Sequence, residues 1–374
     1  MNSPELREQC AQKLLAGQEQ IKTFSAFIGL DGFVDEIIHV VNKRQSAEKF
    51  ERLTLMRQLA ERILGAAGKS TNIELAVQQT KLGGNGPIMA NALAVFGVKV
   101  TYLGALGYPT LHPLFQQFAQ AVQVHSLAEP GHTDALEFDD GKIMLGKMEP
   151  LKEVNWENIQ GRFGRENFAN NFCQSDLVAF VNWTMIPYMS DLWESLQKEI
   201  CPSLPGARRK IFFDLADPEK RNKQDILRAM NLISGFEKYF EVILGLNEKE
   251  AYEISAVLGL DQQPNTPDGL SAMSRALNQK LKINTLVIHP VTYALATSHD
   301  VVDLVAGPFV GQPLITTGAG DHFNAGFCLG KMLGLNNALS VLTGVTTSGF
   351  YVRTAKSPTV LELAESLRHW KERE

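Results

Sequence analysis

Short apolar runs alternate with amphipathic segments of helical length along nearly the whole chain. The apolar runs predict strands at Phe24–Leu30, Val98–Leu103, Leu177–Val181, Lys210–Asp214, Val242–Leu246 and Thr285–His289. The periodic segments predict an N-terminal helix from Pro4 to about Glu19 and further helices at Pro87–Phe96, Asp191–Glu199, Asp225–Ile233, Glu248–Leu258 and Leu270–Leu281. This order predicts an α/β fold in which helices flank a mostly parallel central sheet.

Two stretches interrupt the alternation. Between Ile37 and Leu82, a charged helical pattern at about Ala47–Leu64 precedes an alternating run at Ser70–Gln79. The segment Ala135–Leu145 alternates on both sides of an Asp-Gly pair, which is a strong hairpin signal. We therefore predict a small β-rich lid on a larger α/β domain. The lid would comprise residues 37–82 and 126–150, and the main domain residues 1–36, 83–125 and 151–374.

The composition narrows the class of protein. Of 374 residues, 44% are hydrophobic and 21% charged, which is typical of a globular protein. The net charge of −5 gives no overall basic field for nucleic acid or an anionic membrane. No apolar run approaches the roughly 20 residues of a membrane-spanning helix, and the charged N-terminus is unlike a signal peptide. The four cysteines form no CxxC pair, so we expect free thiols and a cytoplasmic location.

A glycine motif near the C-terminal end carries the strongest chemical signal. Gly318, Ala319 and Gly320 let the backbone turn tightly before a helical pattern, so that their N–H groups can form an anion hole. Asp321 follows directly, where a carboxylate could accept the proton of a hydroxyl that attacks a phosphoryl group. Taken alone, the motif is explained at least as well by a glycine-rich turn before an ordinary helix.

A second glycine motif precedes the predicted helix Pro87–Phe96. Gly83 and Gly84 permit close approach of the backbone, and Asn85 adds an amide that can donate and accept hydrogen bonds. Pro87 suits the first turn of the helix. Such a site could hydrogen-bond a polyol.

With both motifs in this order, the sequence resembles the ribokinase, or phosphofructokinase-B type, family of carbohydrate kinases, from about Phe24 to Val352. The family pattern joins a Gly-Gly motif before a helix to a C-terminal Asp-Thr-x-Gly-Ala-Gly-Asp, whose last residue is the catalytic base. The resemblance implies a ribokinase-like fold and transfer of the terminal phosphate of ATP to a sugar hydroxyl, with Asp321 as general base. Ile315 replaces the first aspartate of the pattern, which takes no part in proton transfer.

The resemblance also implies a substrate site. Asp35 matches an aspartate that binds sugar hydroxyls, with Gly84 and Asn85 beside it. Asp31 lies four residues earlier, where a second substrate ligand and a turn or cap residue are about equally good interpretations. The small-molecule partners implied are a sugar and a nucleotide, without nucleic acid or membrane, and the lid strands of this family can pair across a homodimer.

Asn247 and Glu250 match a family motif for magnesium and phosphate handling, although a simple helix capping box explains the same spacing. The resemblance implies Mg²⁺ and ATP, allows for a monovalent cation, and identifies no direct protein ligand of a metal. Asp214 and Arg221, after a central strand, could face the phosphates or only pair in solvent. His322 is a weaker candidate for a catalytic partner.

The segment His289–Thr292 departs from the family pattern. The family usually shows Thr-x-Gly-x-x-Gly here and wraps the nucleotide, whereas Pro290 and Val291 remove backbone freedom and an N–H donor. One alternative is therefore a non-catalytic sensor of carbohydrates or nucleosides that has lost nucleotide binding. Another is a nucleoside kinase, which would need aromatic walls for a flat base, and the lid runs hold few aromatic residues beyond Phe138.

Overall fold

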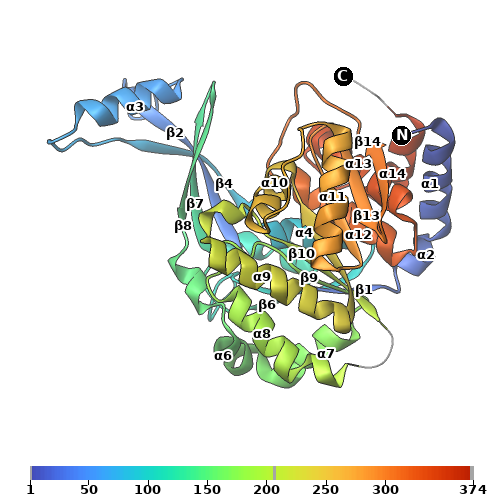
Figure 1. The fold of residues 1–374 in the computed structure, drawn as a ribbon. Coiled ribbons are helices and arrows are strands. Elements are labelled where there is room, and N and C mark those ends of the chain that lie inside the picture. Colours follow the sequence, from blue (N-terminus) through green and yellow to red (C-terminus); the bar gives the residue numbers. More distant parts are fainter. Residues whose placement is uncertain (1, 205–207, 371–374) are drawn as a thin grey trace.

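The chain folds into a large α/β body from which a smaller sheet projects (Figure 1). The structure is a computed structural model and describes residues 2–204 and 208–370. Within these residues the large sheet has nine strands, in the order β14-β13-β12-β11-β10-β9-β1-β5-β6. Strands β12 to β6 in this order are parallel, and β13 and β14 are antiparallel. The predicted mostly parallel sheet is confirmed.

The parallel strands form where the apolar runs predict them, with ends that differ by at most two residues. These strands are β1 (Ser25–Leu30), β5 (Lys99–Gly104), β9 (Leu177–Phe180), β10 (Arg209–Asp214), β11 (Phe240–Leu246) and β12 (Thr285–Ile288). The edge strands are β6 (Gln123–Ser126), β13 (Tyr293–Ser298) and β14 (Val301–Ala306).

Each face of the large sheet buries an apolar layer of its own. Within β10, Ile211 and Phe213 belong to one layer and Phe212 to the other, because successive side chains of a strand point to opposite faces. One layer includes residues of α7 (Arg165–Gln174), α8 (Met189–Glu199), α9 (Lys223–Gly235), α10 (Glu248–Val257) and α11 (Pro267–Leu281). The other includes residues of α1 (Pro4–Ala16), α4 (Asn85–Phe96), α5 (Phe118–Ala121), α12 (Ala319–Met332), α13 (Asn337–Thr354) and α14 (Val360–Arg368). Burial on both faces explains why these strands are continuous apolar runs.

The smaller sheet is the structural counterpart of the predicted lid. Its strands are β2 (Phe33–Arg44), β3 (Phe50–Arg52), β4 (Leu75–Gly83), β7 (Gly131–Phe138) and β8 (Gly141–Lys147), in the order β3-β2-β7-β8 with β4 paired to β2. Helix α3 (Met56–Gly65) lies at its outer end (Figure 1). Exposed apolar side chains occur on β4 and β8, at Leu75, Val77, Met144 and Leu145. Pairing of these strands across a homodimer stays a prediction.

One local prediction for this region is wrong, and one strand was missed. The helix expected at about Ala47–Leu64 begins only at Met56, and strand β3 occupies part of the preceding segment. Strand β2 was not predicted, because its register shifts between Ile37 and Ile38 and the alternation of side chains is broken there. Since β2 begins at Phe33, Asp35 lies within the smaller sheet.

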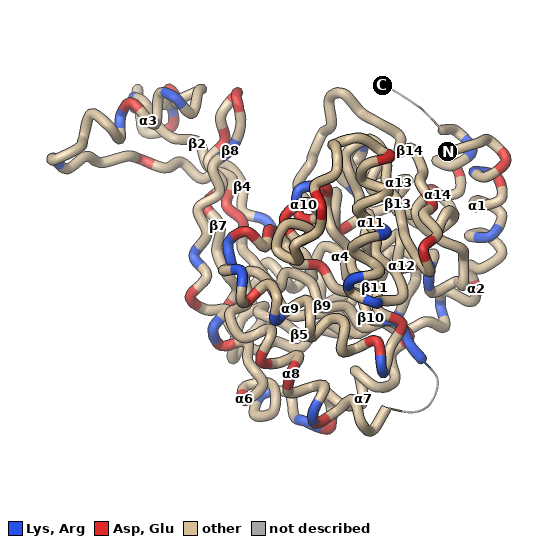
Figure 2. Tube along the Cα trace, viewed as in Figure 1, with Lys and Arg blue, Asp and Glu red and all other residues tan. Residues whose placement is uncertain are grey.

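Charged residues of both signs are distributed along the chain. Figure 2 shows Lys and Arg mixed with Asp and Glu along the trace of both the body and the smaller sheet. Among the described residues, no helix combines the length and apolarity needed to cross a membrane. All four cysteines are free thiols, as expected.

The close packing of α12 against α13 yields a stability prediction. A Cβ on Gly326 would lie 2.3 Å from Thr347 Oγ1 and 2.8 Å from the backbone oxygen of Thr343. Gly326→Val should therefore destabilise the fold by about 1–3 kcal/mol through overpacking, as measured by urea unfolding. Gly65→Val is the matched control, because a Cβ there meets no atom within 4 Å. Equal stability of the two variants would contradict the prediction.

Candidate active site

The carboxylate of Asp31, just after β1, is completely buried and ties three segments together. It accepts hydrogen bonds from the N–H groups of Asn85 and Gly86, both at 2.9 Å, and from Asn182 Nδ2 at 2.8 Å. The Tyr102 hydroxyl lies 2.7 Å from the carbonyl oxygen of Asp31 and 3.1 Å from its Oδ1. Burial raises the pKa of this carboxyl, and the hydrogen bonds oppose that rise. The carboxylate therefore holds the turn at Asn85 and Gly86, and substrate binding by Asp31 stays a prediction.

Asp35 lies beside that same turn. A Cβ on Gly83 would fall 2.3 Å from Oδ2 of Asp35, so the carboxyl group rests directly on the glycine backbone. Burial raises the pKa of Asp35, while a hydrogen bond from Thr133 and the charge of Lys81 act against the rise. The carboxylate predicted to bind sugar thus contacts the glycine motif predicted to bind sugar.

Asp321 faces Asn85, 236 positions earlier in the chain. Asn85 Nδ2 donates to Oδ1 of Asp321 at 2.9 Å. Burial raises the pKa of Asp321 to about 8; the charges of Asp31 and Glu250 add to the rise and the Asn85 hydrogen bond opposes it. The two glycine motifs therefore meet at one point, and a proton-accepting group with an unusually high pKa lies there.

The turn before α12 offers two of the three expected anion-binding amides. Gly318 adopts a left-handed conformation with φ 91°, which glycine tolerates and other residues rarely adopt. The N–H of Ala319 donates to the carbonyl of Thr316 at 3.1 Å and is therefore occupied within the turn. The amides of Gly318 and Gly320 have no hydrogen-bond acceptor among the described residues. The anion hole at Gly318, Ala319 and Gly320 stays a prediction.

Further buried carboxylates lie near Asp321. Asp214, at the end of β10, accepts a hydrogen bond from Asn324 Nδ2 at 2.8 Å. Burial raises the pKa of Asp214 well above its usual value, and the charges of Glu250 and Asp321 raise it further. Glu250 accepts from the N–H groups of Asn247 and Asp217, both at 2.8 Å, and so completes the capping box of α10. The capping interpretation of Asn247 and Glu250 is therefore confirmed, and their role toward phosphate stays a prediction.

A cavity of about 400 Å³ opens beside the start of α12. Its polar end includes Gly320, Asn247 and His289. Most of its remaining wall is apolar and comes from Pro290, Val291, Pro308, Phe309, Val310, Pro313, Phe323, Val345 and Val352. An apolar slot next to the N-terminus of a helix can hold a nucleoside and bind the attached phosphates.

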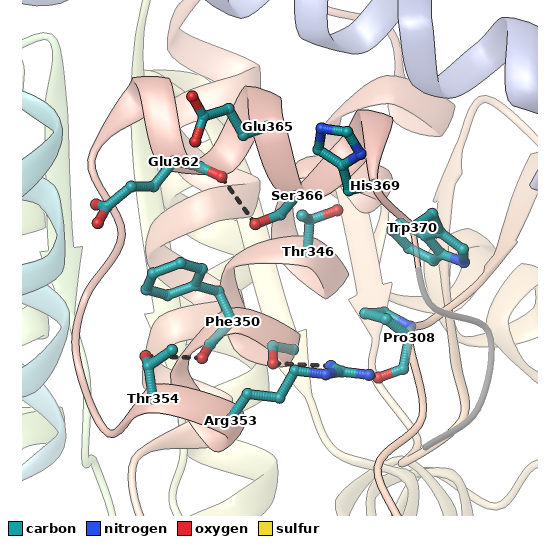
Figure 3. Close-up of a pocket in the computed structure, with 11 residues that line it drawn as sticks. Pro308, Thr346, Phe350, Arg353, Thr354, Glu362, Glu365, Ser366, His369 and Trp370 are labelled. Atoms are coloured by element: carbon teal, nitrogen blue, oxygen red, sulfur yellow. Dashed lines mark hydrogen bonds between the residues drawn. The ribbon is translucent and has the colours of Figure 1, made fainter.

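A second cavity, of about 410 Å³, lies behind a shared wall. Pro308 and Gly349 line both cavities. Figure 3 shows the guanidinium of Arg353 beside Pro308. Its Nη1 donates to the carbonyls of Pro308, at 3.1 Å, and Gly349, at 2.9 Å. None of the predicted site residues lines this second cavity. Arg353 therefore supports the wall of the first cavity.

Neither of the two residue groups with metal-ligand spacing in the described residues includes a predicted site residue. In the smaller sheet, Glu36, His132 and Asp134 converge, and Lys147 already pairs with Asp134 at 2.9 Å. The other group is Asp217, Glu219 and Glu253, and Lys249 pairs with all three. In both groups a lysine supplies positive charge that a metal ion would otherwise provide.

Two weaker candidates have structural roles. The ring of His322 stacks on Tyr351 at 3.7 Å, and its two nitrogens lie within 2.9 Å of Gly318 O and Ser357 Oγ. Arg221 Nε donates to the carbonyl of Thr184 at 3.0 Å. Arg221 also stacks on an indole ring. Neither His322 nor Arg221 lines the 400 Å³ cavity.

Sequence reasoning missed the partners of the buried acids. Asn182 follows β9, and its place just after a parallel strand is the signal that could have revealed it. Asn324 occupies one turn of α12 beyond the motif and Tyr102 lies inside β5. No local signal marks these two residues, because their roles depend on long-range contacts.

Comparisons with known proteins agree with this geometry. A family model described as prokaryotic ketohexokinase matches residues 6–370. A ketohexokinase from Haloferax volcanii is 28% identical over 347 residues, which are 92% of this chain and 91% of that protein.

Solved structures share the fold. A nucleoside kinase of the ribokinase family from Methanocaldococcus jannaschii has a TM-score of 0.60 at 16% identity, covering 93% of this chain and 99% of that one. An Arabidopsis thaliana ribokinase complexed with ribose and ATP has a TM-score of 0.61 at 15% identity, covering 92% and 98%.

Fold and comparisons together define the class, a sugar kinase of the ribokinase family with a ribokinase-like α/β fold. Within that class the chain belongs to the prokaryotic ketohexokinase family. The resemblance inferred from the two glycine motifs is thereby confirmed.

The different surroundings of Asp31 and Asp35 lead to a testable contrast. Asp31→Asn would turn an amide NH₂ toward N–H donors and should lower the free energy of unfolding by about 2–3 kcal/mol. Asp35→Asn should change it by less than about 1 kcal/mol, since no backbone N–H among the described residues donates to that carboxylate. Chemical denaturation measures both. A larger loss for Asp35→Asn than for Asp31→Asn would contradict the positioning role of Asp31.

The raised pKa of Asp321 predicts a pH-dependent stability difference. Between the usual pKa of 3.8 and the folded value of about 8, the folded state holds a proton that the unfolded state releases. Stability therefore falls as pH rises through this window. Asp321→Asn has no carboxyl group to titrate and lacks this loss. The thermal stability of the variant minus that of the parent should therefore be greater at pH 9 than at pH 4. Differential scanning calorimetry at both pH values measures the effect, and a constant difference would contradict it.

Proposed function

We propose that this protein phosphorylates a ketohexose, using the terminal phosphate of ATP. The name of the family and of its curated relative supports the sugar class. The observation that carries the proposal is the contact of Asn85 with Asp321, because it unites the sugar-side and phosphate-side motifs around one carboxylate of raised pKa.

Asp321 would act as the general base. Its carboxylate takes the proton of the attacking sugar hydroxyl while that oxygen forms a bond to the terminal phosphorus. The bond from this phosphorus to the bridging oxygen breaks, and ADP leaves with the electron pair. The free amides of Gly318 and Gly320 would stabilise the charge that develops on the phosphoryl oxygens.

Asp35, Gly84 and Asn85 would bind the sugar. Asp35 accepts hydrogen bonds from hydroxyl groups, and the backbone at Gly84 allows the sugar to approach. The smaller sheet would cover the bound sugar and exclude water, which otherwise competes as phosphoryl acceptor. In this scheme Asp31 holds the turn and does not contact the substrate.

The charges near the phosphates fit a cation. Asp214, Glu250 and Asp321 are buried. The charges of Glu250 and Asp321 raise the pKa of Asp214, and the charge of Glu250 raises the pKa of Asp321, which a nearby cation would relieve. Mg²⁺ bound with ATP would neutralise phosphate charge. We propose that Asn247 and Glu250 handle it without serving as direct ligands. The prediction of a monovalent cation has no further support.

The geometry favours this activity over its rivals. A sensor without nucleotide binding is less well supported, because a cavity is present despite the changed segment at His289–Thr292. A nucleoside kinase would need an aromatic wall in the lid. Phe138 cannot supply it, since it is 8% exposed and packs with Ile38 and Leu136 inside the smaller sheet.

A coupled ADP-release assay tests the proposal. The purified protein with Mg²⁺ and ATP should turn over at least one ketohexose from a panel that also contains aldoses, sugar acids and nucleosides. Asp321→Asn should lower kcat about 10²–10⁴-fold, the usual contribution of a general base. Turnover of a nucleoside alone, or full activity of Asp321→Asn, would overturn the proposal.

Asp35→Ala separates sugar binding from chemistry. Loss of a charged hydrogen-bond acceptor should raise KM for the ketohexose about tenfold to a hundredfold and leave KM for ATP unchanged. Lys147→Ala on the same sheet is the control, because its side chain pairs with Asp134 and is 62% exposed. Equal effects of the two variants would contradict a sugar-binding role for Asp35.

A further inference from the structure

His289 is a half-buried residue with an enclosed polar atom for which the fold gives no use. It follows β12 directly, and its N–H donates to the carbonyl of Leu246 at 3.0 Å. Its side-chain atom Nε2 is enclosed and has no hydrogen-bond partner among the described residues. Leaving a buried polar atom unpaired typically destabilises a fold by about 1–3 kcal/mol. Such atoms call for a functional explanation.

The imidazole lies between the two parts of the site that would bind phosphate. A Cβ on Gly320 would fall 3.3 Å from His289 Cε1, so the ring lies against Gly320. On its other side the ring packs on Phe323, with centroids 4.7 Å apart. His289 also lines, together with Asn247, both the 400 Å³ cavity and an adjoining pocket. It is therefore the side chain that joins the start of α12 to the start of α10.

The ring can present its nitrogen to that position. A half-turn of the imidazole exchanges Cε1 and Nε2. Nε2 has no hydrogen bond to lose, and the ring gives up a hydrogen bond to the backbone of His289 itself, which frees its proton for Nε2. Burial lowers the pKa of His289 to about 4, so the free protein holds a neutral ring with one N–H proton. A neutral donor can be buried beside the carboxylates without an ion pair, and its N–H suits a phosphate oxygen.

We propose that His289 Nε2–H donates a hydrogen bond to a phosphate oxygen of the phosphoryl-donor nucleotide, beside Gly320. This inference rests on the proposed function. In the family pattern a glycine-rich turn wraps the nucleotide at this place, and here Pro290 and Val291 remove that option. A side-chain donor replaces backbone donors, so the altered segment retains nucleotide binding.

Calorimetric titration with two probes tests the contact without relying on turnover. The probes are Mg²⁺–ADP, which carries the phosphates, and adenosine, which lacks them. His289→Leu should weaken Mg²⁺–ADP binding about tenfold to a hundredfold, the usual effect of losing a hydrogen bond to a charged group. It should leave adenosine binding unchanged. His289→Gln, whose amide can reach a similar position, should retain most of the Mg²⁺–ADP affinity.

His369→Leu is the matched control. This histidine lines the second cavity behind the shared wall (Figure 3), so its loss should leave binding of both probes unchanged. Unchanged Mg²⁺–ADP affinity in His289→Leu would overturn the inference. So would an equal loss for adenosine, because the contact would then be to the nucleoside. If His289→Leu does not fold, the test rests on His289→Gln. Equal weakening of Mg²⁺–ADP binding and adenosine binding in that variant would overturn the inference.

The outcomes also separate this inference from the proposed function. Wild-type protein that binds Mg²⁺–ADP through His289 and phosphorylates no sugar would leave the inference standing and refute the kinase proposal. An active wild type whose His289→Leu variant keeps its KM for ATP would refute the inference alone.

Discussion

Burial of the Asp31 carboxylate without an opposing cation would be strongly unfavourable. The chain offsets this with donors from separate segments: the N–H groups of Asn85 and Gly86, the amide of Asn182 and the hydroxyl of Tyr102. These bonds form only when β1, β5, β9 and the start of α4 are in place. The carboxylate therefore couples the position of the glycine turn to the folding of the central sheet. Side chains on the turn are therefore positioned by the same contacts.

The turn holds Asn85, and Asn85 holds Asp321. A side chain on α12 is thus positioned by a strand near the other end of the chain, and the contact crosses between the two predicted motifs. The same arrangement brings several carboxylates together. The charges of Asp31 and Glu250 raise the pKa of Asp321, and the pKa of Asp214 is raised as well. A site of this kind is poorly stable when fully ionised and favours protons or cations. That property is useful where a proton must be accepted and polyphosphate arrives with its counterion.

The fold was largely predictable because burial on both faces turns parallel strands into continuous apolar runs, and β1, β5 and β9 to β12 follow them closely. Strand β2 was not predictable, since its bulge at Ile37 and Ile38 breaks the period of two. The glycine motifs indicated the candidate site, because their backbone conformations depend on local sequence. Asp31 was ambiguous for the opposite reason: nothing near it in sequence shows that Tyr102 and Asn182 will surround it.

The segment His289–Thr292 shows how a departure from a family pattern can be reinterpreted once the packing is known. From sequence, loss of the glycines predicts a weakened nucleotide site. In the structure the turn leads from β12 into β13 and Pro290 and Val291 become part of an apolar wall. Pro308 also belongs to this wall, and Arg353 donates a hydrogen bond to its carbonyl oxygen. Apolar walls bind a nucleoside but offer nothing to phosphates, so polar contacts must come from elsewhere. We propose that the amides of Gly318 and Gly320, and the unpaired nitrogen of His289 once its ring has turned over, supply them.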